Sequence, residues 1–362
     1  MKKTYLLLAA LSLCIVLLAC GADPTSHSVG AAASAEHNIT VPVEQPISIP
    51  AEDYSHANMQ KDVPSGNFMR FEDIVLFSSR ETSMLYMYDI KTGEVDLFCK
   101  DATCTHCSGS CAAAGVRCNL ERYNGTIYGS SGPGPVMELR NGRFEPVIDE
   151  TVSHFWHSDG NLYVVSMDNS LLVYENGSRT PLMVVEEYSG YWETIFDGYL
   201  YFESGANVNR IALRAEQPQQ EILVENADFL TDGAHIYYTP YQDQYLYRCN
   251  MDGSGSTLIF DKPVLASRMS FDKEYFYFLL YTDYTNLKRE DGADIIELYR
   301  FPKDDPTQIN MIAELDATDG AVYTVPGWDS VFVVCRSSSG EEVIYVVDGD
   351  GGAPQPLILP DY

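Results

Sequence analysis

The sequence is poor in basic side chains. It has 23 Lys and Arg against 52 Asp and Glu, which gives a formal net charge of −29. Such a charge repels phosphate backbones and anionic lipid headgroups, so it argues against nucleic acid as a partner. It is compatible with a cationic ligand, and it also favours solubility without any specific binding role.

The chain also lacks the short motifs of several enzyme classes. It has no P-loop, no dinucleotide-binding glycine pattern, no Gly-x-Ser-x-Gly elbow and no His-Glu-x-x-His motif. A carboxylate pair for glycoside hydrolysis is not excluded in this way, because the pair is defined in space and 52 acidic residues offer many combinations. The sequence therefore assigns no catalytic residue.

The N-terminus has the pattern of an export signal. Lys2 and Lys3 precede the apolar run Leu6–Ala19, which has signal-peptide length and is too short to span a bilayer comfortably. We therefore expect residues 1–19 to be a signal peptide.

The end of this run resembles a known processing site. Leu17-Leu18-Ala19-Cys20 is similar to the lipobox of bacterial lipoproteins. The resemblance implies cleavage before Cys20 and a lipid on its thiol, and two or more acyl chains anchor a protein stably. It therefore implies a chain that is lipid-anchored to the cell membrane and faces the extracytoplasmic side.

The next segment, residues 20–64, begins Gly-Ala-Asp-Pro-Thr-Ser and shows little periodicity. Its composition buries too little apolar surface to fold, so we expect a flexible tether. Residues 65–362 are expected to form the folded domain.

That domain is built on a repeated four-strand pattern. The pattern is clearest between Asp228 and Asp261, where short apolar strands alternate with turns such as Asp232-Gly233. Similar turns recur along the chain, and Gly, Asn and Asp tolerate the positive φ of tight hairpins. The seven expected units are Asn67–Phe98, Leu120–Ile148, Ser153–Val185, Glu193–Val224, Asp228–Asp261, Arg268–Leu315 and Ala321–Leu359.

The spacing of the units indicates the architecture. The equivalent second-strand tyrosines Tyr128, Tyr163, Tyr201 and Tyr237 lie 35, 38 and 36 residues apart, which is near the period of propeller blades. No apolar stripe of helical period and useful length supports a helical solenoid. We therefore expect an all-β fold, a β-propeller of four-stranded antiparallel blades, with seven blades favoured over six or eight.

The strand order of the terminal units predicts how the ring closes. The first unit begins with an innermost strand near Asn67–Arg70, and the last ends with an outermost strand near Pro356–Leu359. We therefore expect closure by packing between blades, without a strand shared between the termini.

One repeat carries a family resemblance. Tyr245-Leu-Tyr-Arg-Cys-Asn-Met-Asp-Gly-Ser254, following Ile236–Thr239, resembles the YWTD-type propeller repeat of low-density-lipoprotein receptors and related bacterial propellers of unknown function. The resemblance implies the fold and no active site.

The main departure from the repeat is a cysteine-rich loop between the first two units. Residues 99–118 contain Cys99, Cys104, His106, Cys107, Cys111 and Cys118. Similar Cys-x4-Cys-x-His loops occur in related bacterial lipoprotein propellers of unknown role. Two interpretations remain open for these residues: disulfides, which suit an extracytoplasmic protein, or a structural zinc site with four thiolate or imidazole donors. A redox or catalytic thiol is a third and weaker alternative.

Two further features have a structural or a ligand-related explanation. Cys249 and Cys335 lie in apolar strands and are expected to be buried free thiols.

The longest insertion within a unit follows Tyr281 and contains Tyr284, and propeller insertions often lie on a ligand-binding rim. We therefore take Tyr281 and Tyr284 as candidate ligand contacts.

The sequence favours one function and leaves two alternatives. We expect a tethered binding module or scaffold for a protein, peptide or glycan, without catalysis. The first alternative is an extracytoplasmic hydrolase or lyase that acts on glycans or peptides and uses convergent carboxylates. The second is a metal- or redox-responsive envelope scaffold.

Overall fold

The computed structural model describes residues 68–79, 82–99, 104, 106, 111, 113–114, 116, 118–185, 188, 194–264, 269–281, 294–325 and 328–360, with only the backbone for Phe71, Cys118 and Tyr281. The chain divides into residues 1–48 and 49–362, and all described residues belong to the second unit. Cys20 and the expected signal peptide and tether lie outside the described residues, and the expected domain boundaries stay predictions. Within the described ranges, no helix is long and apolar enough to cross a membrane.

Every regular element of the described residues is a β-strand. The strands are β1 (Phe68–Phe71), β2 (Ile74–Ser78), β3 (Leu85–Asp89), β4 (Val95–Leu97), β5 (Cys118–Tyr123), β6 (Thr126–Ser130), β7 (Gly134–Arg140), β8 (Arg143–Ser158), β9 (Asn161–Ser166), β10 (Ser170–Glu175), β11 (Ser178–Val184), β12 (Thr194–Phe196), β13 (Tyr199–Ser204), β14 (Asn207–Ala212), β15 (Gln220–Val224), β16 (Ala227–Thr231), β17 (His235–Pro240), β18 (Leu246–Asn250), β19 (Thr257–Phe260), β20 (Ser270–Phe271), β21 (Tyr275–Tyr281), β22 (Ile295–Pro302), β23 (Asn310–Asp316), β24 (Asp319–Thr324), β25 (Ser330–Arg336), β26 (Glu342–Asp348) and β27 (Gln355–Pro356).

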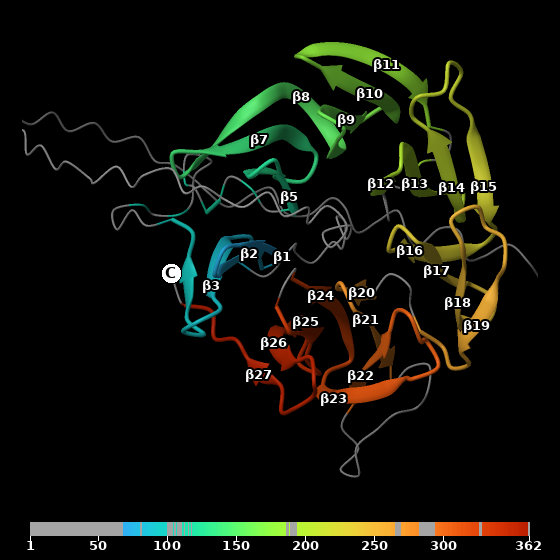
Figure 1. Ribbon diagram of the computed structural model, residues 1–362. Helices are drawn as coiled ribbons and strands as arrows, with labels where there is room; N and C mark the ends of the chain where they lie inside the picture. The colour runs from blue at the N-terminus through green and yellow to red at the C-terminus, as the bar shows by residue number, and fades with distance from the viewer. Residues whose placement is uncertain are drawn as a thin grey trace, which may run out of the picture. The chain divides into compact units, whose positions relative to one another are not determined.

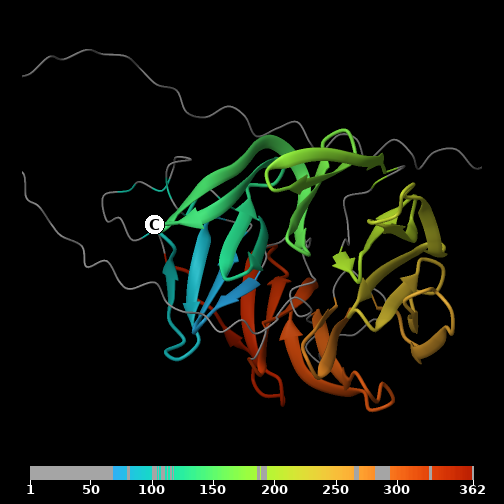
Figure 2. The same ribbon diagram turned by 45° about the horizontal axis from the view of Figure 1, so that its top comes forward.

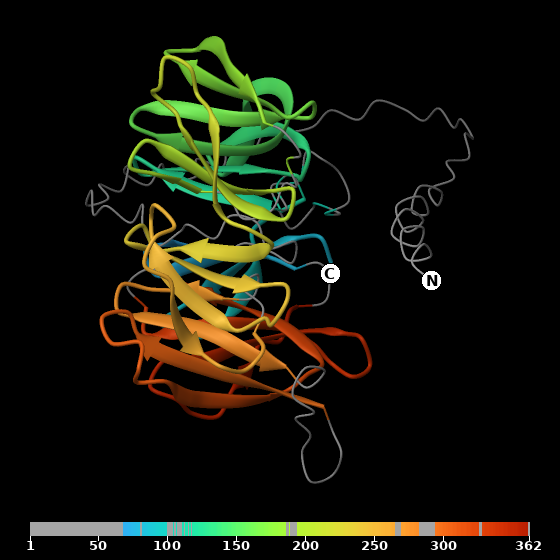
Figure 3. The same cartoon turned by 90° about the vertical axis from the view of Figure 1, so that its right-hand side faces the viewer.

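These strands form antiparallel meanders that follow the chain. Five sheets have four strands each, β1–β4, β12–β15, β16–β19, β20–β23 and β24–β27, and β5–β11 form one seven-stranded sheet. Successive sheets lie next to one another, as Figure 1 shows, and in Figure 3 the yellow β16–β19 sheet lies between its neighbours in sequence. The all-β fold with four-stranded antiparallel units is therefore confirmed.

The seven-stranded sheet arises from one long strand. β8 has 16 residues; its first part pairs with β7 from Arg143 to Val152, and its last part pairs with β9 from Val152 to Ser158. The units expected to end at Ile148 and begin at Ser153 are thus continuous, because no Gly or Pro interrupts the strand between them. Divided at Val152, the sheet gives two four-stranded halves, so the blade count depends on this division and seven stays a prediction.

The turns have the chemistry that the sequence predicted. Asn124, Asp159 and Asp197 have positive φ between 47 and 50°, each directly before a glycine. In the fifth unit Gly233 has φ +81°, and a Cβ there would lie 2.4 Å from a ring carbon of Phe196. Gly233 thus combines a left-handed backbone with close contact between neighbouring sheets.

The second strands of several sheets contribute buried tyrosines to the core. Tyr201, Tyr237 and Tyr277 are almost fully buried, and each faces a third-strand arginine across the ladder. The cross-strand pairs are Tyr201 with Arg210, Tyr237 with Arg248 and Tyr277 with Arg300. These three tyrosines therefore have a structural role, because their rings are buried in the core and the hydroxyls of Tyr237 and Tyr277 donate to Asp232 and Asp272.

The first and last sheets meet by side-chain packing. The ring of Phe68 in β1 stacks on Phe332 of β25 at 4.5 Å and lies 4.8 Å from Tyr323 of β24. The Ser79 hydroxyl donates to Glu342 Oε1 at 2.7 Å. Among the described strands, β1 pairs with β2 and β27 pairs with β26, and Figures 1 and 2 show the blue and red sheets side by side. In the described part of the chain the contact between these two sheets is therefore made by side chains, and ring closure without a shared strand stays a prediction.

Candidate metal centre

The cysteine loop is held at both ends by one residue of the first sheet. The N–H of Phe98 donates to Leu85 O at 2.9 Å, and the N–H of Leu85 donates to Ala113 O at 2.9 Å. Phe98 directly precedes Cys99, and Ala113 lies two residues beyond Cys111. Leu85 therefore brings Cys99 and Cys111 together, although 12 positions separate them in the sequence.

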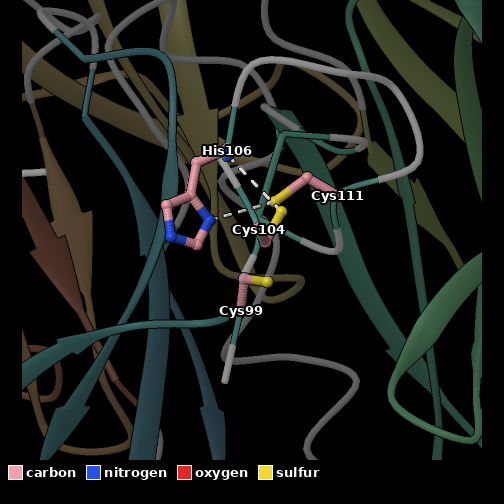
Figure 4. A group of neighbouring side chains, drawn as sticks. All are labelled: Cys99, Cys104, His106 and Cys111. Carbon is pink, nitrogen blue, oxygen red and sulfur yellow. Dashed lines mark hydrogen bonds between the residues drawn. The ribbon is translucent and has the colours of Figure 1, made fainter. Parts of the chain in front are cut away.

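Four donor side chains converge in this loop. One ligand atom each from Cys99, Cys104, His106 and Cys111 lies within 4.8 Å of the other three. Figure 4 shows the four side chains gathered around a common space, with the imidazole of His106 facing Cys111. The donors come from one tight loop, so the site depends on few distant contacts.

One donor separation in the cluster matches that of a tetrahedral thiophilic ion. With Zn–S near 2.3 Å and Zn–N near 2.0–2.1 Å, tetrahedral ligation separates two sulfurs by about 3.8 Å and a sulfur from a nitrogen by about 3.6 Å. The separation between His106 Nδ1 and Cys111 Sγ is 3.5 Å. Three thiols and one imidazole make a soft set of the kind that selects zinc over magnesium or calcium.

Backbone amides already point at two of the sulfurs. The N–H of His106 donates to Cys104 Sγ at 3.4 Å, and His106 has a positive φ of 55°. The amides of Ala113 and Ala114 point at Cys111 Sγ and favour its thiolate. Burial nevertheless raises the pKa of Cys111 to about 11, and the Cys104 and Cys99 thiols add to this rise. A bound cation would offset this cost and use the amide bonds to stabilise thiolates.

The four-donor cluster provides a complete set of protein ligands for a tetrahedral ion. Cys111 is 3% exposed, and Cys99, Cys104 and His106 are half-buried. Four protein donors fill a tetrahedral ion, which leaves no position for water or substrate. The arrangement can cross-link the chain and does not provide a catalytic Lewis acid.

The side chains of only some residues expected to bind a metal, form a disulfide or contact a ligand are described by the structure. No disulfide joins Cys99, Cys104 and Cys111 to one another. Cys107 lies outside the described residues, and the side chain of Cys118 is not described, so pairing through either stays a prediction. The same holds for ligand contact at Tyr281, whose side chain is not described, and at Tyr284, which lies outside the described ranges. Cys249 and Cys335 are buried free thiols, as expected.

A carboxyl pair that the sequence analysis missed lies between β13 and β16. The Tyr241 hydroxyl lies 2.7 Å from Asp228 Oδ1 and 3.2 Å from Glu203 Oε1. Glu203 is 8% exposed, and burial together with the charge of Asp228 raises its pKa to about 7. The sequence did contain a signal, because Glu203 is an acid within the otherwise apolar strand Tyr199–Ser204.

A second buried polar contact joins β5 to β8. His157 Nδ1 lies 2.8 Å from Glu121 Oε2, and the N–H of His157 donates to both carboxylate oxygens at 3.0 and 3.1 Å. The two side chains are 9% and 10% exposed. The imidazole ring lies against Tyr123 and Tyr128, at 4.8 and 4.2 Å between ring centres. This set is structural, since the ring is buried, packs against two aromatic rings and is paired with the carboxylate.

Comparison with known proteins shows the fold and no family. No family model matches the chain, and no curated protein matches it. Among solved structures, the puromycin-hydrolyzing peptidase of Mycobacterium tuberculosis is 10% identical, covers 86% of this chain and 56% of its own, and has a TM-score of 0.51. BamB from Moraxella catarrhalis is 14% identical, covers 59% of this chain and 68% of its own, and has a TM-score of 0.39. The designed protein Ika8 is 10% identical, covers 79% and 96%, and has a TM-score of 0.42.

The peptidase likeness and the antiparallel sheets together define an all-β, propeller-like protein. At this identity the likeness extends to the fold alone.

Proposed function

We propose that this protein is a lipid-anchored, extracytoplasmic β-propeller that serves as a binding scaffold and holds one structural zinc ion. The proposed zinc site is supported by one observation: the ligand atoms of Cys99, Cys104, His106 and Cys111 all lie within 4.8 Å of one another. When bound, zinc supplies a cross-link between four points of a loop that has little core of its own. The ligand of the scaffold is a protein, peptide or glycan.

The membrane part of the proposal is supported by the N-terminal sequence. The run Leu6–Ala19 and the Leu17-Leu18-Ala19-Cys20 tetrapeptide have the order that lipid attachment at Cys20 requires. Replacing Cys20 by Ser would remove the acyl acceptor. We expect the wild-type chain in the membrane fraction and the Cys20→Ser chain outside it; equal membrane association of the two contradicts the anchor.

The metal part is tested on protein purified without reductant. We expect about one zinc per chain by elemental analysis, and Cys99, Cys104 and Cys111 protected from a thiol reagent until the metal is chelated. His106→Ala should lose the zinc, while Cys249→Ala, which removes a buried thiol outside the cluster, should retain it. A metal-free chain whose mass is two units lower for each pair of cysteines would instead establish disulfides and overturn the zinc site.

The alternative function, an extracytoplasmic hydrolase or lyase, is supported by one observation. Glu203 and Asp228 approach the same tyrosine hydroxyl, and the raised pKa of Glu203 suits a proton donor at neutral pH. If the chain cleaves glycans or peptides, Glu203→Gln and Asp228→Asn should each lower the rate at least a hundredfold. Turnover that survives both substitutions excludes this pair as the catalytic site.

A further inference from the structure

The segment that follows the metal ligands enters the core between two sheets. Ala113 and Val116 are fully buried. Val116 packs in one cluster with Leu76 and Leu85 of the first sheet and with Leu120 and Ile127 of the second. The loop is therefore part of the apolar contact between β1–β4 and β5–β8.

Val116 also lies directly against the backbone of the second sheet. A Cβ on Gly129 of β6 would lie 2.5 Å from Val116 Cγ1, so the valine occupies the place that a larger residue would fill. This close approach makes the packing sensitive to the position of the loop. A shift of Val116 would open a space between the sheets.

The strand that follows the loop is irregular at its start. Cys118 pairs with Ser130, but regular pairing with β6 resumes only at Glu121, and Asn119 has a positive φ of 52°. The start of β5 therefore has few ladder hydrogen bonds of its own. Its position depends on the residues before it, which lead back to Cys111.

We infer that the metal ion acts as a lock on the junction between β1–β4 and β5–β8. By joining Cys99, at the exit of the first sheet, to Cys111, it fixes the segment that carries Ala113 and Val116 into the core. Loss of the ion frees that segment, breaks the bond from Leu85 N–H to Ala113 O, and loosens this junction while the other junctions stay closed. This inference rests on the proposed metal site and adds a metal-dependent conformational change to it.

The test is hydrogen exchange of the full chain with zinc bound and after chelation. We expect the Leu85 amide and the amides of β5 and β6 to exchange at least tenfold faster after chelation, and zinc addition to restore protection. Amides of β25 should change less than twofold. His106→Ala should reproduce the chelated pattern without chelator, and Cys249→Ala should keep the zinc-bound pattern.

Three outcomes overturn the inference, and they differ in what they leave standing. If zinc binds and its removal leaves Leu85 exchange within twofold, the metal site stands and the lock is wrong. If all sheets lose protection equally, the ion stabilises the whole domain and the lock is again wrong. If the wild-type chain binds no zinc, the proposed metal site itself fails, and the lock with it.

Discussion

At the scale of single residues, the contact around Tyr241 requires a proton. A phenolic hydroxyl has one hydrogen, yet its oxygen lies within hydrogen-bond distance of carboxylate oxygens of both Asp228 and Glu203. The hydrogen serves the shorter bond to Asp228, so the second bond needs a donor. A protonated Glu203 would supply that donor, and burial favours this form by raising its pKa to about 7.

This proton makes stability depend on pH. The pKa of Glu203 is about 7 in the folded chain against 4.5 for the ordinary carboxyl, so the folded state binds more protons between these values. Stability should therefore fall as pH rises from about 4.5 to 7. Glu203→Gln mimics the protonated acid, and we expect it to abolish this fall and to stabilise the domain at pH 8 on the order of 1 kcal/mol, since solvent screens the pair.

Urea unfolding at pH 5 and pH 8 measures this effect. The exposed Glu94→Gln serves as the control, because it changes charge equally without touching the pair. A wild-type chain that gains stability between these two pH values relative to Glu203→Gln would contradict the prediction.

Gly129 offers a second test at this scale. Gly129→Ala places a methyl group against the fully buried Val116, which has no free space to move into. We expect a loss of about 1–3 kcal/mol in the free energy of unfolding from overpacking, together with weaker zinc binding. Gly352→Ala is the matched control, because nothing lies within 4 Å of the added carbon. Equal unfolding midpoints for the two variants would show that Val116 can adapt.

At the scale of strands, the Glu121 carboxylate connects β5 to β8. It accepts hydrogen bonds from the backbone and the ring of His157, and both side chains are about nine-tenths buried. Glu121→Ala leaves these groups of His157 without their acceptor inside the protein. We expect a cost of about 2–4 kcal/mol, measured by chemical denaturation.

The control for this prediction is an exposed ion pair. Lys91 and Asp73 form a contact whose side chains are 71% and 45% exposed. Lys91→Ala should leave the midpoint unchanged within error, because water replaces the partner at the surface. If Glu121→Ala also leaves the unfolding midpoint unchanged, the buried contact does not contribute to stability.

The strands also show what a sequence can and cannot predict. The four-strand pattern predicted between Asp228 and Asp261 is found as β16–β19, because apolar runs bounded by turn residues such as Asp232 and Gly233 are recognisable locally in the sequence. The continuity of β8 was missed, since no Gly or Pro separates the end of one unit from the start of the next. Glu121 and His157 were missed for a different reason: they lie 36 positions apart, and only the packing of β5 against β8 brings them together.

The metal ligands, too, were predicted only in part from the sequence. Their residue types and spacing suggested four donors, but the sequence left open which of five cysteines take part. Cys99 and Cys111 meet because Leu85 bonds to the backbone on both sides of the loop. That choice depends on a tertiary contact with β3, which spacing alone does not contain.

At the scale of the whole domain, closure depends on aromatic packing. Phe332 is fully buried and contacts Phe68 of β1 as well as Tyr88 and Trp328. Phe332→Ala should cost about 3–5 kcal/mol, as large-to-small core changes do. We also expect faster hydrogen exchange in β1 and β2, because the first sheet loses its contact with the last.

Phe301→Ala is the matched control, since it removes an equally buried ring from the β20–β23 sheet. It should destabilise the domain without accelerating exchange in β1 ahead of the other sheets. Similar exchange in β1 for the two variants would mean that closure does not depend on Phe332.

The one-sided pairing of β1 has a mechanical consequence. Among the described strands its ladder partner is β2, with pairs from Phe68 opposite Phe77 to Phe71 opposite Ile74. Tension applied to the chain ahead of Phe68 therefore acts first on a short ladder and an aromatic stack. Under force the domain should yield at β1, well before the inner strands of the later sheets are strained. A tether that pulls on this end would thus set the force that the protein withstands.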